Sequence, residues 1–123
     1  MIIAVTGAAG FIGSHLSEAL LTQGHTVVGI DNFDPFYSPE RKKHNLSVLT
    51  PSPRFKLYNT DVRKQKALND IFKKHTIEFV YHLAGRGGVS PSVAKPFYYL
   101  DEIVKGTLSL YEACRKNSVA SVV

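Results

Sequence analysis

The chain has 123 residues, of which 44% are hydrophobic and 20% are charged, and its formal net charge is +5. This composition predicts a single globular domain with its own core and excludes a disordered tail. No Lys or Arg precedes Arg41 and no apolar run approaches the ~20 residues that cross a bilayer, so we expect a cytoplasmic protein without a secretory signal or a membrane partner.

The chain opens with an apolar run, Ile2–Val5, which is followed by three glycines, Gly7, Gly10 and Gly13. We expect the run to be a strand and a helix to begin at about Phe11, so that the amides of the turn and of the helix start point at one place. An anionic pyrophosphate fits there, because unpaired amides and the positive end of the helix dipole favour negative charge. The spacing is Gly-x-x-Gly-x-x-Gly, not the Gly-x-Gly-x-x-Gly of the usual dinucleotide fingerprint.

The next elements add an acidic residue to this glycine turn. The first helix is expected to end near Gly24, and a second strand, Thr26–Ile30, ends at Asp31. A carboxylate at this place accepts hydrogen bonds from both hydroxyls of an adenosine ribose and repels a 2′-phosphate, which favours NAD over NADP. The alternative is that Asp31 only begins a turn with Asn32.

The middle of the chain predicts a short helix, a strand and a longer helix. Glu40–Leu49 forms the short helix after Pro39, and Phe55–Tyr58 is the third strand. Asp61 follows that strand and has two open roles, a contact with the adenine amino group or the N-cap of a helix from Val62. The apolar stripe of that helix consists of Ala67, Leu68, Ile71 and Phe72.

The last part of the chain contains two more strands and a long helix. The strands are Glu78–Leu83 and Ala120–Val123, and a loop with Pro91 and Pro96 leads into the helix, Phe97–Lys116. Two apolar stripes on this helix predict one contact with the sheet and one with something outside the chain. The first stripe is Phe97, Leu100, Val104, Leu108 and Tyr111, and the second, expected to lack cover from the chain itself, is Ile103, Leu110 and Cys114.

The alternation of strands and helices predicts an α/β fold, a Rossmann-like doubly wound parallel sheet. We expect residues 1–123 to be the N-terminal part of an NAD-binding Rossmann domain, truncated after about five strands, because the sequence stops as the fifth strand begins.

The basic residues and the single cysteine suggest no further kind of site. The basic groups at 41–43, 63–66, 73–74 and 115–116 are interpreted as solvated helix faces, so nucleic-acid binding is not expected. Cys114 has no partner for a disulfide or in a metal-ligand spacing, and we expect it to be a buried helix residue.

Five segments, in this order, resemble the extended short-chain dehydrogenase/reductase family: TGAAGFIGSHL, VVGIDNF, NTDVR, VYHLAG and GTLSLYEACR. Within the family they resemble the NAD-dependent sugar epimerases and dehydratases, over essentially all 123 residues. The stretch DNFDPFYSPERKKHNLSVL is most similar to UDP-glucuronate 4-epimerases, and UDP-glucose 4-epimerases resemble the later stretch KPFYYLDEIVKGTL about as well.

The resemblance implies a role for each matching position. It places Gly7, Ala9, Gly10, Phe11 and Ile12 at the pyrophosphate, Asp31, Asn32 and Phe33 around the adenosine ribose, and Asp61 and Val62 at the adenine. It places Leu83, Ala84 and Gly85 along the cofactor, and Val89 and Ser92 at the start of the sugar-nucleotide pocket. His82 is expected to be a packed histidine, because it precedes these lining residues.

The family reaction also implies what this chain lacks. It needs a Tyr-x-x-x-Lys pair, and none of the six tyrosines has Lys at the fourth following position. The catalytic segment and the substrate domain are therefore expected beyond Val123, which makes the chain inactive alone. Ile103 stands where these epimerases usually have Asn, and Gly87 stands where some have Lys.

Three hypotheses remain from the sequence. The first is the NAD-binding part of a UDP-sugar epimerase, the second a non-catalytic dinucleotide sensor or interaction module, and the third a fragment that binds nothing. We also expect self-association, through the helix at 97–116 or through the open edge of the sheet.

Overall fold

The computed structural model describes residues 1–123 and contains one five-stranded sheet in the order β3-β2-β1-β4-β5, with parallel neighbours throughout. The strands are β1 Ile2–Thr6, β2 Thr26–Asp31, β3 Phe55–Asn59, β4 Phe79–His82 and β5 Ser121–Val122. Each predicted strand agrees with the structure within one residue at either end. The chain winds from β1 through β2 to β3 on one side and then crosses to β4, so the predicted doubly wound class is confirmed.

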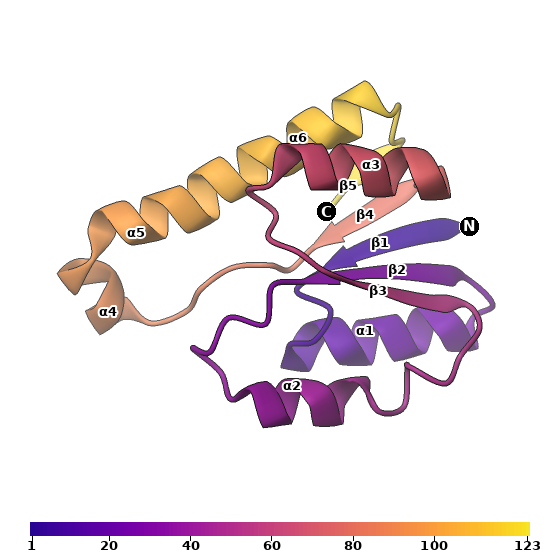
Figure 1. Cartoon of the computed structure of the whole chain (residues 1–123), viewed down its shortest axis with the longest axis horizontal. Coiled ribbons are helices and arrows are strands. Elements are labelled where there is room, and N and C mark those ends of the chain that lie inside the picture. Colours follow the sequence, from indigo (N-terminus) through magenta and orange to yellow (C-terminus); the bar gives the residue numbers. More distant parts are fainter.

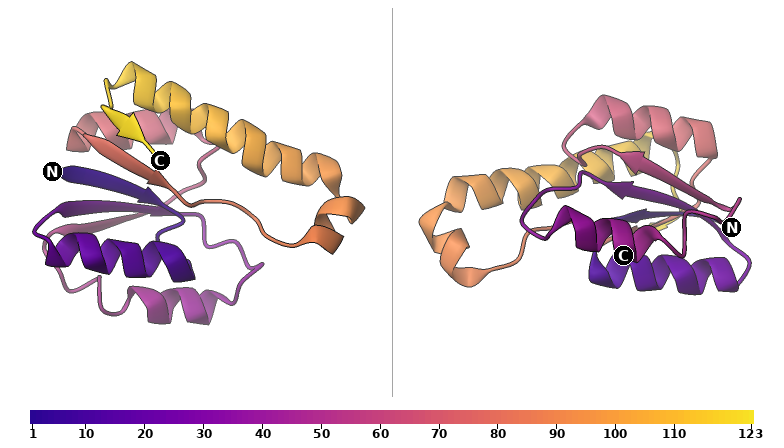
Figure 2. Two further views of the ribbon diagram at one scale, coloured as in Figure 1. Left: turned by 180° about the vertical axis from the view of Figure 1, so that it is seen from behind. Right: turned by 60° about the horizontal axis from the view of Figure 1, so that its bottom comes forward.

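Helices cover both faces of this sheet (Figures 1 and 2). The helices α1 and α2 lie on one face, and α3 and α6 lie on the other. A continuous run of α5, the π-helical turn η1 and α6 spans residues 96–116, and we call it the C-terminal rod. The helix bounds are α1 Phe11–Thr22, α2 Pro39–Leu46, α3 Gln65–His75, α4 Val89–Ala94, α5 Pro96–Leu100, η1 Asp101–Lys105 and α6 Gly106–Lys116.

Two hydrophobic clusters hold the three layers together. Successive side chains of a strand point to opposite faces, so β1 serves both clusters. Val5 packs with Leu20 of α1, whereas Ala4 packs with Phe72 of α3 and Leu110 of α6. The central strands are thus buried on both sides, which fixes the positions of the loops at their carboxyl ends.

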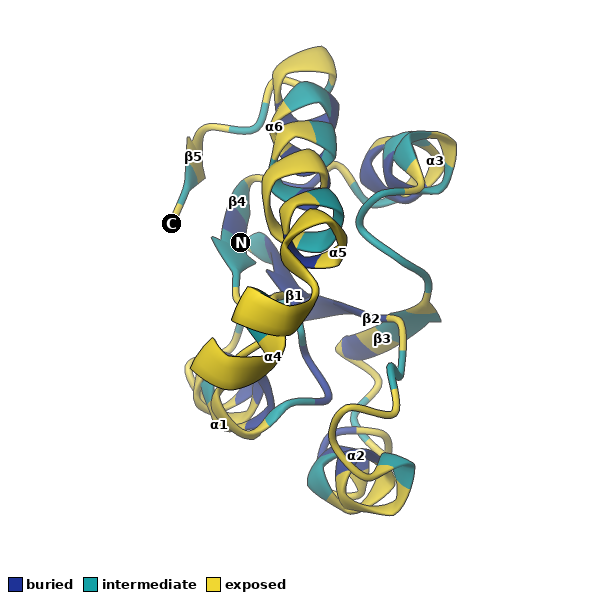
Figure 3. Ribbon diagram, turned by 90° about the vertical axis from the view of Figure 1, so that its left-hand side faces the viewer, coloured by how far each residue is buried: buried dark blue, intermediate teal, exposed yellow.

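The expectation for the two stripes of the C-terminal rod is wrong, because their roles are reversed. Leu110 and Cys114 of the second stripe are 0% and 4% exposed and pack on the sheet, whereas Phe97 and Leu108 of the first are 85% and 61% exposed. Periodicity alone cannot choose between two apolar stripes. Gly106 favours the observed orientation, because a Cβ at this position would lie only 3.0 Å from the Val62 side chain in the loop before α3. Figure 3 shows the exposed side of the rod, and Figure 1 shows α5 extending beyond the sheet.

Two further local expectations are corrected. The loop with Pro91 contains the short helix α4, and Pro91 is tolerated because it lies in the first turn, where amides have no intrahelical acceptor. The helix expected from Val62 begins at Gln65 instead, since the Asp61 carboxylate accepts the amide of Arg63 and forms a separate turn. None of the helices has the length and hydropathy that crossing a membrane requires.

Candidate functional site

A pocket of about 410 Å³ lies at the carboxyl ends of the central strands, beside the point where the winding direction reverses. Ligands of doubly wound sheets bind at this place, because the loops from neighbouring strands separate there. Of the predicted cofactor residues, the pocket is lined by Gly7, Ala9, Gly10, Phe11, Ile12, Gly13, Asp31, Asn32, Asp61, Val62, Leu83, Ala84 and Gly85.

The turn between β1 and α1 forms the first wall of the pocket, and two of its glycines cannot be replaced without a clash. Gly7 has a φ of +70°, and a Cβ there would lie 2.9 Å from the Leu83 carbonyl oxygen. A Cβ at Gly13 would lie 2.1 Å from the carbonyl oxygen of Gly7. The turn is therefore packed directly against the start of α1 and the segment after β4.

The start of α1 presents free amides to the pocket. The amides of Phe11, Ile12 and Gly13 have no acceptor within the chain, and Gly10, at the N-cap, provides no side chain to accept from them. Phe11 and Ile12 are also 75% and 67% exposed. Free amides at the positive end of a helix dipole suit an anion, and this geometry fits a pyrophosphate.

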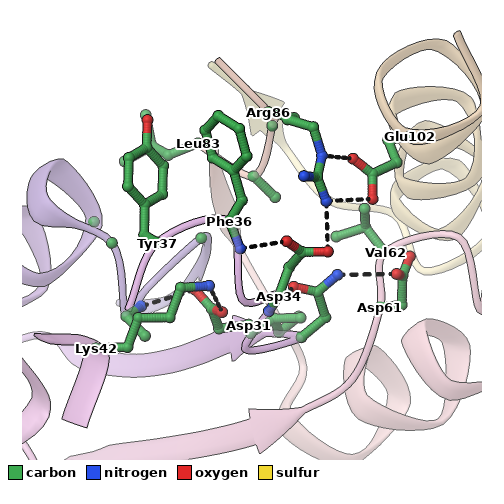
Figure 4. A pocket seen from close by; sticks show the side chains of 18 of the residues that line it. Asp31, Asp34, Phe36, Tyr37, Lys42, Asp61, Val62, Leu83, Arg86 and Glu102 are labelled. Atoms are coloured by element: carbon green, nitrogen blue, oxygen red, sulfur yellow. Dashed lines mark hydrogen bonds and ion pairs between the residues drawn. The ribbon is translucent and has the colours of Figure 1, made fainter. Parts of the chain in front are cut away.

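Asp31 lies at the end of β2 and is only 6% exposed. Its Oδ2 accepts the Ala9 amide at 3.1 Å, and its Oδ1 accepts the Phe33 amide at 2.8 Å and the Lys42 ammonium at 2.9 Å. Figure 4 shows the ion pair of Asp31 and Lys42 beside the pocket. The carboxylate is thus oriented by three donors from three segments of the chain.

Lys42 corrects the interpretation of residues 41–43 as a solvated helix face. It is 7% exposed, because it lies four residues before the buried Leu46 on the same face of α2. Its neighbours Arg41 and Lys43 are exposed. That spacing could have marked Lys42 as an inward-facing residue, and a buried lysine needs a partner of opposite charge.

Phe33 is the one predicted cofactor residue that does not line the pocket. Its side chain packs against the cluster beneath α1 and α2 and does not line the pocket. Phe33 has a φ of 54°, a left-handed conformation that aims its amide at Asp31. The contribution of Phe33 to this site is therefore its backbone amide.

Asp61 sits after β3 in a network with Arg63 and Asn32. The Arg63 guanidinium donates to its two oxygens at 2.9 and 2.8 Å, and Asn32 donates to Oδ2 at 3.0 Å. Hydrogen bonds from the Arg63 side chain hold the pKa of Asp61 well below its usual range. Of its two open roles, the N-cap of α3 is excluded, because that helix begins after Lys64 without a side-chain cap. The adenine contact stays a prediction.

A second wall of the pocket is organised by Arg86 (Figure 4). Its guanidinium donates to Glu102 at 2.6 Å and to the Tyr98 hydroxyl at 3.0 Å, and it pairs with Asp34. The rings of Phe36 and Tyr98 both lie 4.9 Å from its central carbon. Arg86 thus joins the loop after β2, the loop after β4 and the C-terminal rod.

Sequence reasoning did not identify this cluster, because no local pattern signals it. Arg86 and Glu102 are 16 residues apart, and Asp34 is farther still. The other pocket-lining residues that were not predicted are Ile30, Asp34, Phe36, Tyr37, Lys42, Asn45, Thr60, Arg63, Arg86 and Glu102.

The two predicted substrate residues lie outside the pocket. Val89 and Ser92 are on α4, and Val89 is 82% exposed. The Ser92 hydroxyl donates to the Val89 carbonyl oxygen at 2.6 Å. Both residues are separate from the pocket that the strand ends form.

His82, at the end of β4, joins three elements. Its Nδ1 lies 2.7 Å from the Thr6 hydroxyl of β1, and its Nε2 lies 3.0 Å from the Thr107 hydroxyl of α6. Burial lowers the pKa of His82 below 6.5. Both nitrogens are occupied within the fold, as expected for a packed histidine.

The Cys114 thiol is a structural group and not a reactive one. It is buried on α6, and desolvation raises the pKa of its thiol to about 11. The prediction of a buried helix cysteine is confirmed.

The fold and the pocket define a doubly wound α/β protein with a ligand site at its switch point. The family described as GDP-mannose 4,6 dehydratase matches residues 4–123, and the chain belongs to this family.

Several relatives of the chain are named UDP-sugar 4-epimerases. The chain is 40% identical over 119 residues to UDP-glucuronate 4-epimerase of Thermodesulfobacterium geofontis, covering 97% of this chain but 37% of that protein. It is 37% identical over 125 residues to a UDP-glucose 4-epimerase of Klebsiella pneumoniae, covering 100% of this chain and 86% of that sequence. The chain thus spans little more than a third of the first relative.

Solved structures agree with these relatives. UDP-glucuronic acid 4-epimerase of Bacillus cereus, in complex with UDP-glucuronic acid and NAD, superposes with a TM-score of 0.89 at 38% identity. The match covers 99% of this chain and 38% of that one. The suspected resemblance to epimerases, and to their N-terminal part, is confirmed.

Proposed function

We propose that the chain is the NAD-binding N-terminal part of a UDP-sugar 4-epimerase, with UDP-glucuronate or a similar sugar nucleotide as the substrate of the whole protein. The observation that carries the proposal is the convergence of free amides and a fixed carboxylate on one pocket. The amides of Phe11 to Gly13 suit a pyrophosphate, and Asp31 lies where a ribose hydroxyl can donate to it. Solved structures of similar epimerases that contain NAD support the same interpretation.

The site residues have distinct roles under this proposal. The helix start binds the phosphates, Asp31 and Asn32 hold the ribose, and Asp61 and Val62 border the adenine. Leu83 to Gly85 lie along the cofactor. The bound cofactor supplies a hydride acceptor, and the chain's own residues bind and orient it.

Catalysis by this chain alone is not part of the proposal, because no tyrosine is followed by Lys at the fourth position. The general base of the reaction would come from residues after Val123. The coding sequence downstream of Val123 tests this: a Tyr-x-x-x-Lys segment within a few dozen codons supports an enzyme, and a stop codon contradicts it.

NAD binding is tested by thermal unfolding with and without dinucleotide. A ligand that binds only the folded state at 100 times its Kd adds about 2.7 kcal/mol of stability. We expect NAD to raise the melting temperature by more than NADP does, because Asp31 repels a 2′-phosphate. Equal shifts contradict the preference, and no shift with either nucleotide contradicts the function.

A second candidate, a non-catalytic dinucleotide sensor, is favoured by one observation. Ile103 replaces an Asn that is usual in these epimerases, and it is 41% exposed on η1. A sensor would bind NAD with the same pocket but would have no Tyr-x-x-x-Lys segment downstream. The two candidates therefore differ in the coding sequence and agree in the binding assay.

Self-association is also proposed, through the exposed stripe of the C-terminal rod. The stripe is apolar, and Leu108 and Val104 on it are 61% and 59% exposed. Light scattering over a concentration series tests this, with Leu108→Glu expected to shift the protein toward monomer. Monomer at all concentrations for the unaltered protein would contradict it.

A further inference from the structure

We propose that His82 is a positioning residue of the pocket, which acts through the Thr6 hydroxyl. The neutral imidazole accepts the proton of this hydroxyl, and the hydroxyl oxygen holds the Ala84 amide, so that residues 83–85 keep their place along the pocket. A protonated imidazole cannot accept that proton. The inference rests on the proposed dinucleotide binding and adds a positioning residue and a pH dependence to it.

Thr6, the last residue of β1, fixes the segment that follows β4. Its carbonyl oxygen accepts the Leu83 amide at 3.2 Å, and its Oγ1 accepts the Ala84 amide at 3.1 Å. Thr6 is 0% exposed and lies on the central strand of the sheet. Leu83 and Ala84 line the pocket, and the same segment packs against the turn at Gly7. The hold of Thr6 on this segment therefore shapes two sides of the pocket.

The number of protons at the Thr6 hydroxyl sets the direction of its hydrogen bonds. A hydroxyl has one proton, and the oxygen of Thr6 already accepts the Ala84 amide. The other polar atom bonded to this oxygen is Nδ1 of His82, at 2.7 Å. Thr6 therefore donates to Nδ1, because the opposite direction would leave its own proton buried without an acceptor.

This direction places the ring proton of His82 on Nε2. A neutral imidazole has one donor and one acceptor nitrogen, and Nδ1 is the acceptor here. Nε2 lies 3.0 Å from the Thr107 hydroxyl of α6 and donates to it. One chain of hydrogen bonds thus joins the C-terminal rod, the His82 ring, the Thr6 hydroxyl and the Ala84 amide.

Protonation of His82 breaks this chain at Thr6. Both nitrogens of an imidazolium are donors, so the Thr6 oxygen would face two N–H groups, from Nδ1 and from Ala84. The hydroxyl proton would then have no acceptor in a buried place, which is costly. We expect the segment after β4 to shift away from Thr6 in response, and the pocket to lose affinity for a dinucleotide.

No charged group stabilises a proton on His82. The ring is faced by hydroxyls from β1 and α6, and Tyr81, the preceding residue of β4, packs on the opposite face of the sheet. Burial alone lowers the pKa of His82, so the ring is neutral at pH 7. Every carboxylate of the C-terminal rod is already paired, Asp101 with Lys105, Glu102 with Arg86 and Glu112 with Arg115.

Calorimetric titration with NAD at pH 8 tests the bond to Ala84 with two variants of Thr6. Val has the shape of Thr but neither accepts the Ala84 amide nor donates to His82, whereas Ser keeps the hydroxyl. We expect Thr6→Val to bind NAD about tenfold more weakly than the unaltered protein does, and Thr6→Ser to recover most of that affinity. Equal affinities in the two variants, both folded by circular dichroism, contradict the proposal.

A pH series tests His82 itself. NAD is titrated from pH 8 to pH 5, while the protonation of the His82 ring is followed by NMR. Acidification adds positive charge to the exposed histidines, His15 and His44, which favours an anion, and carboxyl groups ordinarily titrate at about pH 4. We nevertheless expect the affinity for NAD to fall at least threefold as His82 takes up its proton, with the same midpoint.

The matched control for this series is His15→Gln. His15 is exposed, and its ring centre lies 4.6 Å from that of the pocket-lining Phe11. We expect His15→Gln to keep the loss of affinity at low pH. We expect His82→Asn to abolish it, because its amide oxygen accepts near the place of Nδ1 and takes up no proton in this range.

Three results overturn the proposal. The first is an NMR spectrum at pH 8 that places the ring proton of His82 on Nδ1. The second is an affinity that stays constant or rises while His82 becomes protonated, and the third is a loss of affinity that persists in His82→Asn. If the ring stays neutral down to pH 5, the Thr6 variants decide, and if Thr6→Val does not fold, the pH series decides.

Failure of this inference is distinguishable from failure of the proposed function. If the unaltered protein binds NAD at pH 8 and one of the contradicting results occurs, the proposed function stands and only the role of His82 is wrong. If the unaltered protein binds no NAD at any pH, both fail.

Discussion

The two walls of the pocket are built by different means. The first wall, the turn from β1 into α1, consists of backbone amides held by close packing of Gly7 and Gly13. The second consists of charged and aromatic side chains around Arg86, drawn from segments far apart in the sequence. The first wall is specified by a short local motif, whereas the second exists only once the chain has folded. Three substitutions test this contrast.

The largest effect is expected at the first wall, in Gly13→Ala. The added Cβ would lie 2.1 Å from a backbone oxygen that cannot move aside, so the turn must distort. We expect a loss of about 3 kcal/mol or more in the free energy of unfolding, measured with urea. Gly85→Ala is the control, since a Cβ there meets nothing within 4 Å and the change should cost less than about 1 kcal/mol. Equal losses in the two variants would show that packing of the turn is not the cause.

A smaller effect is expected at the second wall, in Arg86→Met. The variant leaves Glu102 and Asp34 without their cation, but water reaches this wall and reduces the penalty. We expect a loss of about 1–2 kcal/mol in the free energy of unfolding. Arg115→Met is the matched control, because Arg115 pairs only with Glu112 at an exposed position, and its change should be within about 0.5 kcal/mol. A cost for Arg86→Met as low as that of the control would mean that the second wall is not held by this cluster.

The smallest effect is expected from His82, which lies between the walls and links β1 to α6. Its pKa is lowered in the folded state, so the unfolded chain binds the proton more readily. The stabilising contribution of the neutral ring is fully present above pH 6.5 and is lost as the pH falls through the folded pKa. Unfolding at a series of pH values should show stability decreasing as the pH falls below 6.5, and less of this decrease in His82→Gln. The same pH dependence in both proteins would assign it to other groups.

The sequence predicts the layers and the first wall well, for a physical reason. Strand and helix periodicities are local, and the turn at Gly7 to Gly13 needs residue types that stand out in the sequence. The position of Asp31 follows from the end of β2. These features depend on neighbours in the chain.

The second wall of the pocket, the ion pair of Lys42 with Asp31 and the buried stripe of the C-terminal rod depend on contacts between segments that are far apart in the sequence. The pairing of Arg86 with Glu102 is not visible before the loops are placed, and the spacing of Lys42 to Leu46 indicates burial without identifying Asp31 as the partner. The C-terminal rod carries two apolar stripes, and only packing on α3 and the sheet selects the one with Leu110. The substrate contacts expected of Val89 and Ser92 stay a prediction, because α4 places both residues outside the pocket that the cofactor residues line.

The exposed side chains of Phe11 and Ile12 at the start of α1 give ligand binding a thermodynamic signature. Any molecule that covers the free amides beside them also removes apolar surface from water, and such burial lowers the heat capacity of the complex. The enthalpy of binding should therefore become more negative as the temperature rises. An anion that bound the amides and left both side chains exposed to water would show a binding enthalpy that is almost independent of temperature. The measurement therefore distinguishes a full dinucleotide from an isolated phosphate.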